Sequence, residues 1–94
     1  VVTEGNSHVY NQFTVRVGGG RRDELRQFLA DRSIGSGIYY PVPLHMQDCF
    51  RDLGGREGDL PVTEALCKEV LSLPIFPELG ETRQALVIEA IRSF

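Results

Sequence analysis

The sequence predicts a single α/β (α+β) domain, a two-layer sandwich in which about four helices pack on a small three-stranded sheet. Three observations lead to this fold. A length of 94 residues suits one domain with one modest core. Residues 8–17 alternate apolar and polar side chains, as a half-buried strand does. Residues 21–33 and 81–93 carry apolar side chains at helical spacing, which predicts two helices.

The first predicted strand is His8–Val17, with Phe13 and Val15 on its apolar face. Asn11 also lies on that face and interrupts the alternation. Two interpretations remain open for Asn11: an amide at a strand end that bonds to backbone, or a functional side chain. Gly18–Gly20 then predicts a flexible turn.

The helix predicted over Arg21–Ser33 has a buried stripe of Leu25, Phe28 and Leu29. Gly35 stands where a left-handed residue would end this helix. The sequence therefore predicts a helix that is held to the sheet by one apolar face and ends shortly before residue 35.

The stretch 35–45 (GSGIYYPVPLH) predicts a second strand that leads into a stiff arm. Residues 38–40 are strand formers, and Pro41 ends the strand because it has no N–H for the ladder. Pro41 and Pro43 favour an extended backbone. Such an arm would hold Tyr40 and His45 in defined directions. The same pattern also fits a rigid strand exit with a half-buried tyrosine pair.

The second half predicts three further elements and one irregular segment. Leu44–Leu53 is a short helix or irregular turn. Asp59 caps a helix that has Pro61 in its first turn and Val62 on the apolar stripe that would face a core. Ser72–Phe76 is a short apolar strand. Gly80 precedes the last helix, Glu81–Ser93, whose apolar stripe includes Ile91 and Phe94.

Composition excludes several function classes. The net charge of −3 argues against nucleic acid as the main partner, and no apolar run approaches the length of a membrane span. Cys49 and Cys67 lack the short spacing of metal or redox sites, so we expect reduced thiols in a cytoplasmic protein and no metal site. Gly18–Gly20 lacks the spacing of a phosphate-binding loop.

Three stretches of the chain resemble the C-terminal small domain of the DegT/DnrJ/EryC1/StrS sugar aminotransferases. They are residues 8–16 (HVYNQFTVR) with 22–25 (RDEL), residues 34–47 (IGSGIYYPVPLHMQ), and residues 57–65 (EGDLPVTEA) with 70–77 (VLSLPIFP). These stretches lie in order and cover nearly the whole chain. The resemblance implies the C-terminal domain fold of fold-type I pyridoxal phosphate enzymes, and it implies that residues 1–94 form one small domain of a longer protein.

The resemblance also implies an activity for the complete protein. Such enzymes use pyridoxal 5′-phosphate to move an amino group, usually from glutamate, onto a nucleotide-linked keto-sugar, and they are homodimers. The Schiff-base lysine and most cofactor contacts belong to a large N-terminal domain that this sequence does not contain. Lys68, the only lysine, matches no catalytic position. We therefore expect no catalytic residue, no cofactor site and no transamination in the 94 residues alone.

The site residues that the resemblance implies lie mostly in the arm. In the family, the segment that corresponds to Tyr39–His45 faces the sugar pocket, so Tyr40 and His45 become candidate substrate contacts, and Tyr39 a weaker one. Tyr offers a flat apolar face and an O–H, which suits a sugar ring. Asn11 matches a position that Asn or His holds in the family, so it joins the candidate substrate-binding residues.

Two alternative functions remain open at this point. The complete protein would be a sugar dehydratase if the same cofactor were used without the lysine. The chain would instead be a regulatory or ligand-binding module if it kept the fold without catalysis. The residues upstream of Val1 would separate these readings, because a large domain with the cofactor lysine is specific to the aminotransferase. The first residue, Val1 rather than Met, adds to the expectation that the sequence is part of a longer protein.

Overall fold

The computed structural model describes residues 3–94, so the first two residues of the predicted domain lie outside it. It has two strands, three α-helices and three short 3-10 segments in its described part. In chain order these are β1 (Phe13–Arg16), α1 (Arg22–Ala30), η1 (Leu44–Met46), η2 (Asp48–Leu53), α2 (Pro61–Glu69), β2 (Val70–Leu73), η3 (Pro77–Leu79) and α3 (Gly80–Arg92). The predicted mixture of helix and strand is confirmed.

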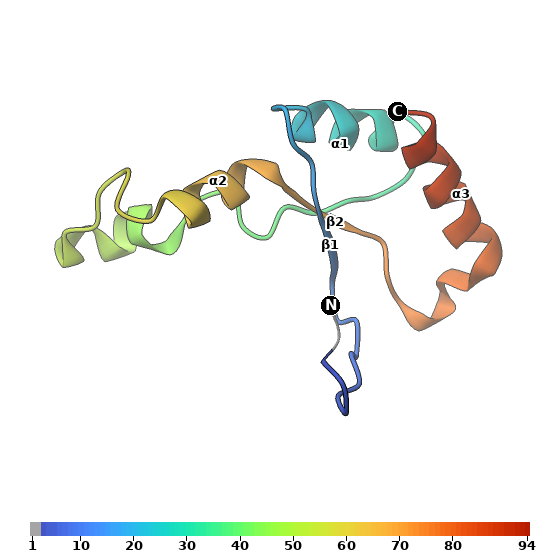
Figure 1. Ribbon diagram of the computed structural model, residues 1–94. Coiled ribbons are helices and arrows are strands. Elements are labelled where there is room, and N and C mark those ends of the chain that lie inside the picture. Colours follow the sequence, from blue (N-terminus) through green and yellow to red (C-terminus); the bar gives the residue numbers. More distant parts are fainter. Residues whose placement is uncertain (1–2) are drawn as a thin grey trace.

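The two strands pair antiparallel at the centre of the molecule, with Phe13 opposite Leu73 and Arg16 opposite Val70 (Figure 1). The hydroxyl groups of Thr14 and Ser72 are hydrogen-bonded at 2.8 Å. β1 is therefore much shorter than the predicted strand 8–17, since the residues before Phe13 have no strand partner among the described residues.

The predicted third strand at residues 38–40 is wrong, because the sheet in the described part of the chain has two strands. One isolated bridge remains, in which Gly37 and Ser72 exchange both backbone hydrogen bonds, with N–O distances of 3.0 and 2.7 Å. The strand predicted over Ser72–Phe76 also begins earlier, at Val70, and ends before Pro74.

The groups along the free edge of β2 explain why this bridge does not grow into a strand. Val70 would be the next partner on one side, but its N–H donates to Leu66 at the end of α2, and its carbonyl accepts from the Arg22 guanidinium at 3.3 Å. On the other side, Pro74 has no N–H to donate. Ser72 is thus the one residue on this edge of β2 with both its N–H and its carbonyl available. Residues 38–40 favour a strand conformation, but they find no further backbone groups with which to pair.

Helix α1 confirms the predicted apolar stripe, since Leu25 and Leu29 are buried and Phe28 is partly buried. Its end differs from the prediction. Ser33, not Gly35, takes the left-handed conformation, with φ of 59°. The Ser33 N–H then donates to the Ala30 carbonyl, and the Ile34 N–H donates to the Leu29 carbonyl at 2.9 Å. This Schellman-type ending turns Ile34 back onto the core.

The core lies between α1, β2 and α3, on one side of the sheet (Figure 1). Its buried hydrophobic members are few: Leu25, Leu29, Leu71 and Ala90. Partly buried side chains surround them, including Ile91 and Phe94 from the predicted stripe of the last helix. α1 and α3 therefore form a compact unit with the sheet.

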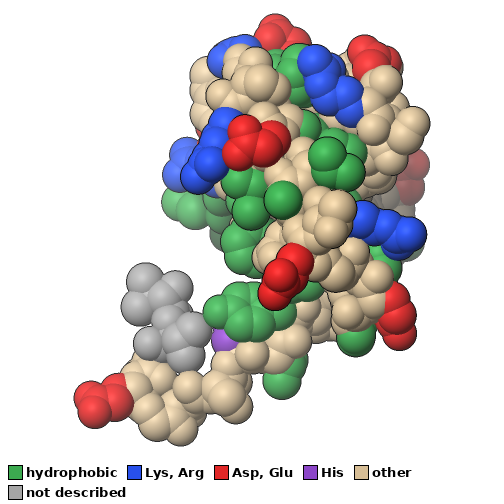
Figure 2. Space-filling model, turned by 90° about the vertical axis from the view of Figure 1, so that its right-hand side faces the viewer, with side chains coloured by type: hydrophobic (Ala, Val, Ile, Leu, Met, Phe, Trp, Pro, Cys, Tyr) green, Lys and Arg blue, Asp and Glu red, His purple; other side chains and the backbone are tan. Residues whose placement is uncertain are grey.

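The segment from η1 through α2 extends to the other side of the sheet, away from α1 and α3 (Figure 1). Residues 48–63 are all exposed, and Val62, predicted to face a core, is 73% exposed. Figure 2 looks at the side of the molecule that carries α3, where hydrophobic side chains also reach the surface between charged ones. Leu86 on that helix is 62% exposed. Much apolar surface is thus left open on both sides of the sheet.

Candidate functional site

The arm of residues 39–45 leaves the sheet at the Gly37–Ser72 bridge. Ser72 is buried, and its hydroxyl is fixed by Thr14, so the bridge gives the arm a rigid origin. The arm then passes through Pro41 and Pro43 and enters η1, where His45 lies. Pro43 is buried, and the extended geometry predicted for it is present, with φ of −58° and ψ of 143°.

Tyr39 folds back over Gly37 at the start of the arm. A Cβ atom added to Gly37 would lie 2.7 Å from the Cζ and Oη atoms of Tyr39, so only glycine leaves room for this ring position. Tyr39 and Asn11 line the same hollow of about 460 Å³, together with Ser36, Ser72 and Phe76. The structure therefore brings together two of the four candidate residues, although 28 positions separate them in the sequence.

Tyr40 points to a different part of the surface. Its ring meets the Tyr39 ring edge-on, with centroids 5.8 Å apart. It is 67% exposed and lines two smaller hollows beside Val42 and Gln47, of about 380 and 300 Å³. Tyr39 also borders the smaller of these. The tyrosine pair thus separates the hollow of Asn11 from those along the outer side of the arm.

His45 faces α2 and is the most enclosed of the four candidates, with a side chain 13% exposed. Its Nε2 atom lies 3.0 Å from Oε1 of Glu64. Its Nδ1 atom is buried and has no hydrogen-bond partner within residues 3–94. His45 does not line the hollows of Asn11 or Tyr40.

The Glu64 carboxylate, in the first turn of α2, collects several donors. The Gly58 N–H donates to both of its oxygens, at 2.9 and 3.0 Å, and the Leu60 N–H donates to Oε1 at 3.2 Å. The Gly58 N–H is the main cause that lowers the pKa of the Glu64 carboxyl, partial burial opposes it, and the His45 hydrogen bond adds to it. Glu64 is therefore ionised and only accepts, so Nε2 of His45 donates in their hydrogen bond.

Sequence reasoning placed Glu64 in a helix but missed this role. An acidic residue three positions after Pro61, in a first helical turn, is a signal for bonds to N–H groups at that helix end. The contact with His45 spans 19 residues and has no local signal. Asp59, predicted to cap the helix, instead accepts from the Arg56 N–H at 2.8 Å.

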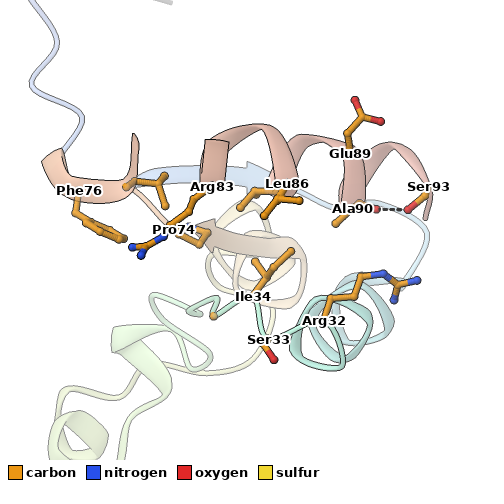
Figure 3. A pocket seen from close by; sticks show the side chains of 13 residues that line it. Arg32, Ser33, Ile34, Pro74, Phe76, Arg83, Leu86, Glu89, Ala90 and Ser93 are labelled. Carbon is orange, nitrogen blue, oxygen red and sulfur yellow. Dashed lines mark hydrogen bonds between the residues drawn. The ribbon is translucent and has the colours of Figure 1, made fainter. Parts of the chain in front are cut away.

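A larger hollow lies elsewhere, between α3, residues 32–35 after α1 and residues 74–79, with a volume of about 790 Å³. Figure 3 shows Ile34 and Leu86 pointing toward each other across it, with Phe76 at one end. Arg32 and Arg83 add positive charge to its lining. None of the four candidate residues lines this hollow.

The side-chain types that bind metal ions or pyridoxal phosphate are scattered in the part of the chain that the structure describes. No three His, Cys, Asp or Glu side chains of residues 3–94 come together as metal ligands would. Lys68 is exposed on α2 and lines none of the hollows described above. Every helix of the described part is too short or too polar to cross a lipid bilayer.

Comparison with proteins of known sequence gives close relatives over almost the whole chain. A protein named "Pleiotropic regulatory protein" from Geobacillus stearothermophilus is 48% identical over 97% of the chain. The dTDP-3-amino-3,4,6-trideoxy-alpha-D-glucose transaminase of Micromonospora megalomicea subsp. nigra is 46% identical over 98% of it. In both comparisons the match covers 24% of the relative, so this chain spans about a quarter of the length of these curated relatives.

Comparison with solved structures gives the same result. The crystal structure of S. venezuelae DesV in complex with a ketimine intermediate matches 99% of the chain with a TM-score of 0.90 and 40% identity, and the match covers 24% of that chain. A sequence profile of the DegT/DnrJ/EryC1/StrS aminotransferases matches residues 1–92. The chain therefore belongs to the DegT/DnrJ/EryC1/StrS aminotransferase family.

Proposed function

We propose that this chain is the C-terminal small domain of a pyridoxal phosphate-dependent aminotransferase that transfers an amino group from glutamate to a nucleotide-linked keto-sugar. The observation that carries the proposal is the likeness to a dTDP-sugar transaminase, 46% identical across nearly all of the chain and spanning a quarter of that enzyme. The fold likeness to DesV supports it over the same residues.

The open surface of the molecule supports a role as one part of a larger protein. Its accessible surface is 7372 Å², whereas a folded monomer of this size exposes about 5,400 Å². Its radius of gyration is 15.9 Å, against about 12 Å for a compact domain of this length. Apolar side chains on the arm, on α2 and on α3 contribute to this excess, and another folded surface would cover them.

Within the complete enzyme, the arm and its neighbourhood would form the sugar-facing side of the active site. Tyr39 and Asn11 would contact substrate from their shared hollow, and Tyr40 would do so from the outer side of the tyrosine pair. His45, the last residue of the arm, would contribute to substrate binding through the position of the arm. The missing N-terminal domain would hold the cofactor and its lysine, and the enzyme would be a cytoplasmic homodimer. The 94 residues alone would have no transaminase activity.

One observation favours a second candidate function. The relative from Geobacillus stearothermophilus, 48% identical, bears the name of a regulatory protein. A regulatory module would keep the fold and the arm but would not depend on turnover of a sugar.

An activity assay of the complete protein that carries this sequence separates the aminotransferase from the regulatory module. Purified with pyridoxal phosphate and supplied with glutamate and dTDP- or UDP-linked keto-sugars, it should release 2-oxoglutarate and form an amino-sugar nucleotide in equal amounts. A Tyr39→Ala/Tyr40→Ala double variant should slow the sugar half-reaction more than the glutamate half-reaction. A protein that holds the cofactor but turns over no keto-sugar would contradict the proposal and favour the regulatory role.

A further inference from the structure

His45 is held from two sides by segments that lie further along the chain. Glu64 of α2 bonds to its Nε2 atom at 3.0 Å. Gly55, in the loop between η2 and α2, lies against its backbone. A Cβ atom on Gly55 would come within 2.6 Å of the His45 carbonyl oxygen and 3.0 Å of its Cβ. One contact fixes the ring of His45 and the other fixes its main chain.

We propose that Glu64 and Gly55 are positioning residues that clamp His45 and thereby set the place of the tyrosine pair for the keto-sugar substrate. The proposal rests on the proposed function, because it holds that these two residues control the position of the arm that faces the keto-sugar. Neither residue touches the hollow of Asn11, so their effect on substrate would pass through the arm.

The arm needs such a clamp because apolar packing around its far end is weak. After His45, Met46 and Phe50 are each 39% exposed and Leu53 is 82% exposed. Residues 48–63 bury no side chain. The Gly37–Ser72 bridge holds the near end of the arm, and two prolines stiffen the residues between. A stiff segment fixed at both ends holds Tyr39 and Tyr40 in place, whereas one fixed at a single end can swing.

The chemistry at Glu64 suits a clamp that joins three segments. Its carboxylate binds His45 of η1, Gly58 of the preceding loop and Leu60 at the start of its own helix. All three partners donate, and an ionised carboxylate offers acceptors only. The loop that Glu64 binds through Gly58 is the one that brings Gly55 onto His45. The two contacts therefore reinforce each other.

Two independent variants of the complete enzyme test the clamp. Glu64→Ala removes the acceptor, and Gly55→Ala inserts a methyl group against the His45 backbone. Both should speed hydrogen exchange in peptides that cover residues 39–47. Both should raise KM for the keto-sugar about tenfold or more, as loss of a hydrogen bond to a charged group or an ångström-scale displacement of the arm would do. The glutamate half-reaction should change less than twofold.

Matched controls separate positioning from general damage. Glu57→Gln changes an exposed acid of the same loop, and Gly18→Ala adds a methyl group where nothing lies within 4 Å. Both should match the wild type. Glu64→Gln keeps one carbonyl oxygen for His45 and should reverse most of the increase in KM for the keto-sugar that Glu64→Ala causes.

Two results would overturn the clamp: unchanged exchange in residues 39–47 in both variants, or an equal loss in the two half-reactions. A wild-type enzyme without any sugar turnover would instead overturn the proposed function. In that case, faster exchange in the arm of both variants would still establish the clamp, and unchanged exchange would reject it.

Discussion

Gly37 and Ser72 exchange both of their backbone hydrogen bonds, and this single bridge attaches the candidate site to the sheet. Ser72 is buried in the middle of β2, so the bridge transmits the position of the sheet directly to the arm. Tyr39, two residues further on, packs its ring over Gly37. The place of this candidate substrate residue thus depends on a glycine that no pattern in the sequence marks as important for it.

Gly37→Ala should displace the Tyr39 ring while leaving the fold intact. The added methyl group would overlap the far end of a side chain that is 49% exposed and free to turn away. Stability should fall by less than about 1 kcal/mol, since side-chain rotation relieves the overlap. In the complete enzyme, kcat/KM for the keto-sugar should fall if Tyr39 contacts substrate. Gly18→Ala is the control, and kinetics identical in the two variants would remove Tyr39 from the site.

Leu29→Ala should destabilise the chain by about 2–5 kcal/mol, because Leu29 is fully buried and the core contains few enclosed side chains to close the resulting cavity. Leu86→Ala makes the same chemical change at a 62% exposed position and should alter stability by less than about 0.5 kcal/mol. Denaturant unfolding of both variants measures the difference. Equal losses would mean that the core lies elsewhere than between α1, β2 and α3.

Acid should loosen the loop that precedes α2. The pKa of Glu64 is lower in the folded chain than in the unfolded chain, so the unfolded state binds the extra proton as the pH falls. The stability that ionised Glu64 contributes is complete above the ordinary pKa of a glutamate side chain and is lost as the pH falls through the lowered folded-state pKa. The stability difference between wild type and Glu64→Gln should therefore narrow from pH 7 to pH 3. A difference that stays constant over this pH range would contradict the prediction.

The helices could be predicted from the sequence because burial of a one-sided apolar stripe decides them. Leu25 and Leu29 are spaced for one face of a helix, and that face meets the core. The same reasoning failed at Val62, whose helix lies beside the arm and is largely exposed. Periodicity thus identifies a helix, but it does not say whether the chain itself contains the surface that covers the apolar face.

Whether residues 38–40 form a strand could not be predicted from those residues alone. Its strand propensity is real, but pairing depends on the partner edge, where Pro74 lacks an N–H and Val70 has given its backbone groups to Leu66 and Arg22. The candidate site could not be predicted in full for the same reason, because it depends on contacts between residues far apart in the sequence. Asn11 and Tyr39 share a hollow, and Glu64 binds His45, through contacts between distant positions that no local pattern encodes.

The 94-residue chain produced alone should not hold pyridoxal phosphate covalently. Its only lysine, Lys68, is exposed on α2, without the enclosed surroundings that activate a lysine as a nucleophile. Absorbance after addition of the cofactor, followed by borohydride reduction and mass spectrometry, measures attachment, with Lys68→Ala as the control. Stoichiometric labelling of Lys68 would show that the domain carries a cofactor site of its own.

Tyr40→Phe tests the proposed contact between the arm and the sugar with the smallest possible change. Tyr40 is 67% exposed, so removal of its hydroxyl should leave the melting temperature unchanged. If that hydroxyl binds the keto-sugar, the variant of the complete enzyme should lose about 0.5–1.5 kcal/mol of transition-state stabilisation, a decrease of roughly 2- to 12-fold in kcat/KM. The glutamate half-reaction should not change. Tyr10→Phe, at a tyrosine 47% exposed and outside the arm, should leave both half-reactions unaltered. A Tyr40→Phe enzyme with wild-type sugar kinetics would limit Tyr40 to contacts of its ring, which Tyr40→Ala would then reveal as a larger loss.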